Sequence, residues 1–187
     1  MPNAKKGHKN AARPTPVQIK NFGQKGNDTM IKRCEKLAFM KVGSTDVYTR
    51  MKGFTELSVS KNPKEYSRKY IDEDMERSAV VGYSPAMTYK LDLDPTDSVH
   101  SVFANIADHE LTGDEAVKSV AIVDVSSLDT DGKANAIIRN FTIIPSSEGD
   151  DSDTYTAGGT MKAAGEITFG KAATSDSWAT VTITENN

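Results

Sequence analysis

Side chains that could do chemistry are few in this chain and widely spaced. The three histidines stand at positions 8, 100 and 109, and Cys34 is the only cysteine. His100 and His109 fall on a predicted helix, nine residues apart, which at about 100° per residue places them on opposite faces. They therefore cannot share a metal ion or a substrate, and we interpret them as solvated or capping side chains. Cys34 we interpret as a small, semi-buried residue rather than a nucleophile.

Three short motifs begin like known sites, and none is complete. Residues 82–86 (GYSPA) start like a serine nucleophile elbow but end in alanine and precede a strand. Residues 158–160 (GGT) lack the lysine and the spacing of a phosphate-binding loop. Residues 129–132 (DTDG) start like a calcium loop, yet position twelve is Asn140 instead of glutamate. The sequence thus predicts no enzyme and no bound cofactor.

An acidic loop is predicted at 146–156, after Pro145, which we expect to stop the preceding strand. Its carboxylates could hold a divalent cation weakly, but a solvated acidic loop is the favoured interpretation, and no metal site is predicted. The acidic residues are Glu148, Asp150, Asp151 and Asp153.

The bulk composition suits one domain with appendages. The chain has 187 residues, of which 37% are hydrophobic. A single cysteine excludes an internal disulfide framework and is compatible with a reducing cytoplasm. No apolar run approaches the ~18 residues of a membrane span, and the start lacks the apolar region of a secretory signal. We therefore expect a soluble protein without a membrane segment.

Charge is divided unevenly along the chain. Residues 1–52 carry 12 Lys and Arg against three acids, whereas residues 53–187 carry 11 basic and 23 acidic residues. Opposite charges at the two ends favour head-to-tail contact between copies. Residues 1–30 are predicted to form a flexible basic arm, because 13–16 (RPTP) prevents regular structure. The basic residues of the arm are Lys5, Lys6, Lys9, Arg13, Lys20 and Lys25.

Two other interpretations of the arm stay open. It could bind nucleic acid through its lysines, although Phe22 is its only aromatic residue and base stacking is poorly provided for. It could also be a solvated leader without a partner.

Residues 31–187 are predicted to form a mainly β domain with one flanking helix. The helix, about 95–111, begins after Asp94 and ends before Gly113. The chain should finish with a strand pair, 159–169 and 178–184. The other predicted strands are 37–42, 47–52, 54–60, 86–94, 117–125 and 134–144.

An excursion at about 61–80 is too charged to line a core, yet it is rich in contact residues. Local rules favour a helix, with Asn62 as N-cap, Pro63 at the first position and Glu65 completing a capping box. Its narrow apolar stripe and strand-like flanks favour an extended hairpin instead. In either form we expect it to pack against another chain. The predicted interface residues are Asn62, Tyr66, Arg68, Tyr70, Ile71, Asp72, Glu73 and Met75.

Several short segments, in this order and spacing, resemble the major tail tube proteins of long-tailed (siphovirus-type) bacteriophages, especially those infecting Gram-positive hosts. The resemblance spans roughly residues 31–185 and leaves out the arm. No one segment is chemically diagnostic. The matching segments are 51–57, 62–73, 81–85, 113–117, 136–141 and 164–170.

The resemblance implies a β-sandwich or barrel whose hexameric rings stack into a hollow tube. In that family a long loop reaches onto adjacent subunits, which favours the hairpin for residues 62–77, and the basic arm would reach an acidic surface on the next ring. DNA passes through the lumen, during ejection, without being bound. The implied partners are further copies, the tape-measure protein, the tail terminator and tail-tip proteins, in a virion tail made in the host cytoplasm.

Three alternatives remain. The chain could form the inner tube of a contractile tail or of a phage-derived particle. A nucleic-acid-binding module using the basic arm is less favoured, and a hydrolase with an unrecognised site is least favoured.

Overall fold

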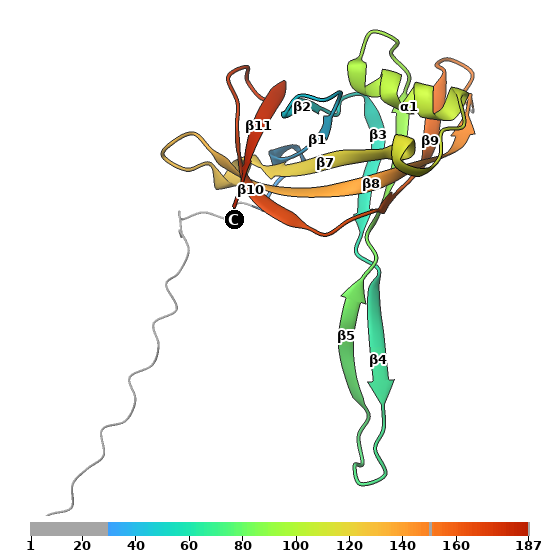
Figure 1. The fold of residues 1–187 in the computed structure, drawn as a ribbon, viewed down its shortest axis with the longest axis vertical. Helices are drawn as coiled ribbons and strands as arrows, with labels where there is room; N and C mark the ends of the chain where they lie inside the picture. The colour runs from blue at the N-terminus through green and yellow to red at the C-terminus, as the bar shows by residue number, and fades with distance from the viewer. Residues whose placement is uncertain (1–29, 150, 187) are drawn as a thin grey trace, which may run out of the picture. The chain divides into compact units, whose positions relative to one another are not determined.

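The computed structural model describes residues 30–149 and 151–186. The described part holds eleven strands, one α-helix and three short 3-10 helices, so the predicted mainly β fold with a single helix is confirmed (Figure 1). In chain order the elements are η1 (Arg33–Glu35), β1 (Lys36–Lys41), β2 (Val47–Arg50), β3 (Phe54–Ser60), β4 (Pro63–Arg68), β5 (Arg77–Tyr83), β6 (Ala86–Asp92), α1 (Ser98–Asp108), η2 (Gly113–Ala116), β7 (Val117–Asp124), η3 (Val125–Ser127), β8 (Ala134–Glu148), β9 (Thr156–Ala163), β10 (Thr168–Ala173) and β11 (Thr180–Glu185).

Six antiparallel strands close into a barrel. Their order is β10-β11-β2-β1-β7-β8, and a further pairing of β10 with β8 completes the circle. Alternate side chains point inward, among them Phe39, Val123 and Ile138, and form one hydrophobic core. Because the barrel is closed, each of these six strands has a paired neighbour on both sides.

A second core lies on the outer side of the barrel wall. There β9, β6 and β3 extend the sheet from β8, and α1 packs with them through Phe103 and Ile106. The long strand β8 serves both cores. Ile138 points into the barrel, whereas Phe141 and Ile143, at positions of opposite parity, are buried in the second core.

The last three strands differ from the predicted pair. The run 159–169 divides into β9 and β10, which follow one another along the same edge of β8. Ala163 pairs with Phe141 and Thr168 pairs with Ile138. The chain therefore advances by five residues from β9 to β10, whereas the facing part of β8 spans only three. This extra length separates the barrel from the sheet extension, and β11 pairs with β10 rather than β9.

Pro145 does not end its strand as predicted. Strand β8 runs on to Glu148, with a register shift between Pro145 and Ser147. Such a bulge accommodates proline, which has no N–H to donate to the ladder.

Helix α1 is shorter at both ends than the predicted 95–111. Asp97, rather than Asp94, caps it, accepting hydrogen bonds from the backbone N–H groups of Val99 (2.7 Å) and His100 (3.3 Å). At the other end Glu110 adopts a left-handed conformation (φ 49°), which ends the helix before Leu111.

His100 is buried, so its interpretation as a solvated or capping residue is wrong. Its Nδ1 accepts a hydrogen bond from the Asp94 backbone N–H (3.0 Å), and its Nε2 donates to the Lys52 carbonyl (2.7 Å). A Cβ at position 53 would lie 2.8 Å from the imidazole, so Gly53 makes room for the ring. The imidazole thus fixes α1 to the chain before β3. His109 is exposed on the other face, as predicted.

Cys34 also differs from its prediction. It lies in η1, which has no buried residue, and is exposed rather than semi-buried. Among the described residues, no helix is long and apolar enough to cross a membrane.

We predict that His100→Ala lowers the free energy of unfolding by roughly 2–4 kcal/mol, because a buried side chain is truncated and the two part-buried hydrogen bonds to the Asp94 N–H and the Lys52 carbonyl are lost. His109→Ala, on the exposed face of the same helix, should change it by less than about 0.5 kcal/mol. Urea unfolding followed by circular dichroism measures both. Equal effects of the two substitutions would contradict this role of His100.

We also predict that Gly159→Ala destabilises the fold by more than about 2 kcal/mol, because a Cβ there would clash with the Ile144 carbonyl and approach the Tyr89 hydroxyl to 2.9 Å. Gly165→Ala is the matched control, since its nearest neighbour would lie at an ordinary 3.7 Å. Thermal unfolding of the two variants measures the difference. A Gly159→Ala variant as stable as the control would contradict the close packing of Gly159 against Ile144 and Tyr89.

Candidate interaction surfaces

The excursion is a two-stranded hairpin, made of β4 and β5, that projects from the rest of residues 31–187 (Figure 1). Of the two forms that the sequence left open, the extended hairpin is confirmed and the predicted helix is wrong. All of β4 is exposed, and so is all of β5 except Gly82. The hairpin therefore contributes almost nothing to either core of its own chain.

Asn62 does not have the role of helix N-cap that the helical alternative gave it. Its φ is 43°, which is not a helix-capping conformation. Its side chain accepts a hydrogen bond from the Ser60 hydroxyl (2.7 Å) and donates to the Ser84 carbonyl (3.1 Å), while its own carbonyl accepts from the Ser84 N–H (3.0 Å). Asn62 thus ties the two strands together at the base of the hairpin.

One face of the hairpin carries stacked aromatic and basic side chains. The guanidinium carbons of Arg68 and Arg77 lie 5.6 and 5.9 Å from the centre of the Tyr70 ring. Arg68 also donates a hydrogen bond to the Tyr66 hydroxyl (3.3 Å), and Arg77 forms an ion pair with Glu73. These contacts are local to the hairpin, and they position both tyrosines while leaving them about half exposed.

The tip of the hairpin, defined here as residues 70–76, is apolar and acidic at once. Ile71 is fully exposed and Met75 is 80% exposed. Asp72 and Asp74 lie between them in the sequence and are also exposed. Exposed large apolar side chains grouped in this way are typical of a contact surface.

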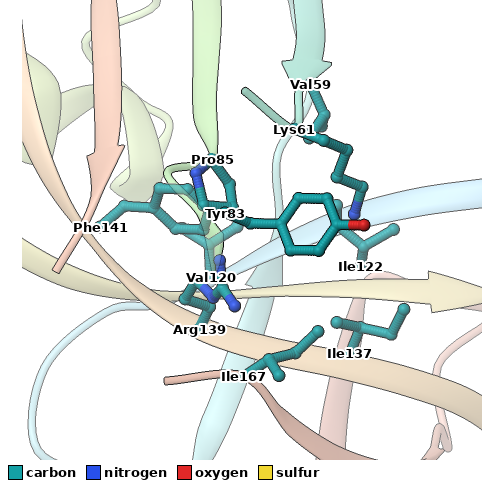
Figure 2. Close-up of a pocket in the computed structure, with 10 residues that line it drawn as sticks. All are labelled: Val59, Lys61, Tyr83, Pro85, Val120, Ile122, Ile137, Arg139, Phe141 and Ile167. Atoms are coloured by element: carbon teal, nitrogen blue, oxygen red, sulfur yellow. The ribbon is translucent and has the colours of Figure 1, made fainter. Parts of the chain in front are cut away.

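A groove of about 410 Å³ lies at the base of the hairpin (Figure 2). The Tyr83 ring lies across it, with Val59 and Lys61 on one side and Ile137 and Ile167 on the other. No feature of the sequence predicted this groove. Its lining residues are Val59, Lys61, Tyr83, Pro85, Val120, Ile122, Ile137, Arg139, Phe141 and Ile167.

The floor of the groove is the outer face of the barrel. Ile122 pairs with Ile137, and Ile137 pairs with Phe169, so these side chains form a row across β7, β8 and β10. The row continues to Ala38, which the second core covers. Ile137 and Phe169 stay 39% and 54% exposed, because the sheet extension stops short of them.

Arg139 lies in these apolar surroundings, and one of its guanidinium nitrogens has no partner in the described part of the chain. It pairs across the sheet with Val120, a fully buried core residue, and follows Ile138 of the barrel core. Its Nε atom is buried and has no hydrogen-bond partner among the described residues. A buried donor left unpaired is costly, by about 1–3 kcal/mol and more for a charged group. Such an atom needs a partner that the described residues do not supply, which can be a water molecule, an ion or another chain.

The acidic loop is smaller than predicted, because β8 includes Glu148. The Tyr155 hydroxyl donates to Glu148 (3.3 Å), and the carboxylate raises the pKa of Tyr155. Asp151 accepts a hydrogen bond from the Asp153 N–H (3.0 Å). In the parts of the chain that the structure describes, no three His, Cys, Asp or Glu residues gather as metal ligands. Asp150 lies outside the described residues.

The predicted interface residues Asn62, Tyr66, Arg68, Tyr70, Ile71, Asp72, Glu73 and Met75 all lie on the hairpin or its base. Residues 1–29 of the predicted basic arm, which include Lys5, Lys6, Lys9, Arg13, Lys20 and Lys25, lie outside the described residues.

Comparison with known proteins gives little further information. No protein-family model matches the sequence, and no curated protein matches it. Among solved structures, a chain of the 6-fold symmetrised baseplate of the anti-feeding prophage, determined by cryo-EM, is similar at 10% identity and a TM-score of 0.46. The match covers 76% of this chain and 97% of that one. A likeness at this level indicates nothing about the partners or activity of this chain.

Proposed function

We propose that this protein is a structural subunit that assembles with copies of itself into stacked hexameric rings, forming the hollow tail tube of a bacteriophage. The observation that carries the proposal is the hairpin: a long exposed element with two positioned tyrosines and an apolar tip that fills no core of its own chain. Its role is to bind a neighbouring subunit.

The energetics of hairpins support a partner. An isolated two-stranded hairpin is at best marginally stable in water, since it has no hydrophobic face covered. Here the ribbon is held by Asn62 at its base and by the arginine–tyrosine contacts along one face. Exposed ion pairs and cation–π contacts contribute little, roughly 0–1 kcal/mol each. Docking against a neighbour would bury Ile71 and Met75 and supply the missing stabilisation.

In this proposed role the protein carries out no chemical step. His100 uses both ring nitrogens in structural hydrogen bonds, and Tyr89 is buried in the second core with its pKa raised by burial. The excess of acidic residues in 53–187, 23 against 11 basic ones, would suit a lumen through which DNA passes without specific binding. The other proposed partners are the tape-measure protein, the tail terminator and tail-tip proteins, which would meet the tube inside and at its ends.

The direct test is electron microscopy of the purified protein at increasing concentration, alone and with tail-tip and tape-measure partners. Rings or hollow tubes are expected in negative stain. A monomer in every condition and partner mixture would contradict the proposal.

We predict that the double substitution Tyr66→Ala with Tyr70→Ala leaves the monomer folded and raises the concentration needed for assembly by more than about tenfold, because two positioned aromatic contacts are lost. Light scattering and circular dichroism measure assembly and folding.

The control is Ser67→Ala with Ser78→Ala, a cross-strand pair on the opposite face of the hairpin. It should assemble close to normally. Normal tubes from the tyrosine variant would show that this face is not an interface, even if the tube subunit itself is correctly assigned.

A further inference from the structure

We propose that the groove at the base of the hairpin is the receptor for the tip of a second copy's hairpin, with Arg139 pairing a carboxylate of that tip. The inference rests on the proposed self-assembly and names the two surfaces that meet.

The groove has two properties that a partner must satisfy. Its walls are mainly aliphatic and aromatic, and Ile137 and Ile167 are about 40% exposed, so it favours apolar side chains. It also contains the Arg139 guanidinium, whose Nε is buried without a partner, and no ion pair joins Arg139 to a carboxylate among the described residues. A suitable partner therefore combines apolar side chains with a carboxylate.

The tip of the hairpin has this chemistry. Ile71 and Met75 present large apolar side chains to solvent. Asp72 and Asp74 are exposed between them, whereas Glu73 is already paired with Arg77. A carboxylate can accept two parallel hydrogen bonds from a guanidinium, which gives the contact direction as well as energy. The tip thus complements the groove in both polarity and charge.

Other segments of the chain suit the groove less well. Residues 1–29 carry six Lys or Arg and one acid, the same sign of charge as Arg139 and Lys61. The chain's own tip cannot fold back to its base, because β4 is a six-residue extended strand, which at ~3.3 Å per residue spans roughly 20 Å. The occupant is therefore a second copy.

The geometry of this contact repeats. Tip and groove are different surfaces at opposite ends of one hairpin, so each copy offers one of each. Such a head-to-tail contact propagates in one direction, closing into a ring or continuing as a filament. A reciprocal two-fold dimer, in which each tip fills the groove of the other copy, would also use both surfaces, and growth beyond a dimer distinguishes the two arrangements.

The key variant is Arg139→Met, which keeps a long side chain and removes the unpaired donor. The monomer should be at least as stable to heat as the original protein, while the concentration needed for assembly should rise more than about tenfold. A residue with only a structural role would instead lower thermal stability. Lys133→Met, an exposed lysine in the turn before β8, is the control and should assemble normally.

Charge reversal tests the pairing itself. Arg139→Glu alone, and Asp72→Lys with Asp74→Lys alone, should each prevent assembly at concentrations where the original protein assembles. Mixing the two variants should restore pairs of unlike copies, because each supplies the charge that the other lacks. Size-exclusion chromatography with light scattering measures the mixture. Failure of the mixture to associate would contradict the direct pairing.

A cysteine pair tests proximity. In a Cys34→Ser background, Ile71→Cys with Ile137→Cys should form disulfides between copies on oxidation, and Ile71→Cys alone should form far fewer. If the protein assembles but Arg139→Met assembles unchanged and no such disulfide forms, the docking is wrong while the proposed function stands. If the original protein never assembles, both are wrong.

Discussion

Strand β8 is the element on which the rest of the structure depends, because its two halves bury opposite faces. Ile138 closes the barrel core, and three residues later Phe141 begins the second core on the other side of the wall. Along one edge β8 pairs first with β10 and then with β9, with the extra residues of 164–167 between them. Arg139 lies at this change of face, between the second core at Val120 and Phe141 and the outer surface at Ile137 that neither core covers. The groove is thus a direct consequence of how one strand is shared between two cores.

The hairpin is the second consequence of the sheet extension. Strands β4 and β5 continue β3 and β6 beyond the point where Asn62 ties them together. Strand β6 is anchored in the second core by Met87, Tyr89 and Leu91, so the base of the hairpin is fixed while its tip meets only solvent. The same pair of strands therefore positions both surfaces, the tip at one end and the groove wall, through Val59, at the other.

Sequence reasoning located β3 at 54–60 and β6, where alternation is strong, and it located the excursion. It could not choose between helix and hairpin at 62–77, since Asn62, Pro63 and Glu65 satisfy local helix rules and only pairing across the ribbon overrides them. His100 was misjudged because its partners, Lys52 and Asp94, come from other elements. Arg139 was missed because periodicity shows which residues share a face, but not which part of that face stays uncovered. An arginine inside a β-branched run was the one available signal.

Hydrogen exchange of the hairpin amides is the sharpest measurement, because residues 63–83 are largely exposed in the monomer and, in the proposed particle, are covered by a neighbour. We expect fast exchange across the hairpin in dilute monomer and at least about tenfold slower exchange there after assembly, while amides of the barrel strands stay protected in both states. Hairpin amides that exchange equally fast in monomers and in assembled particles would contradict it.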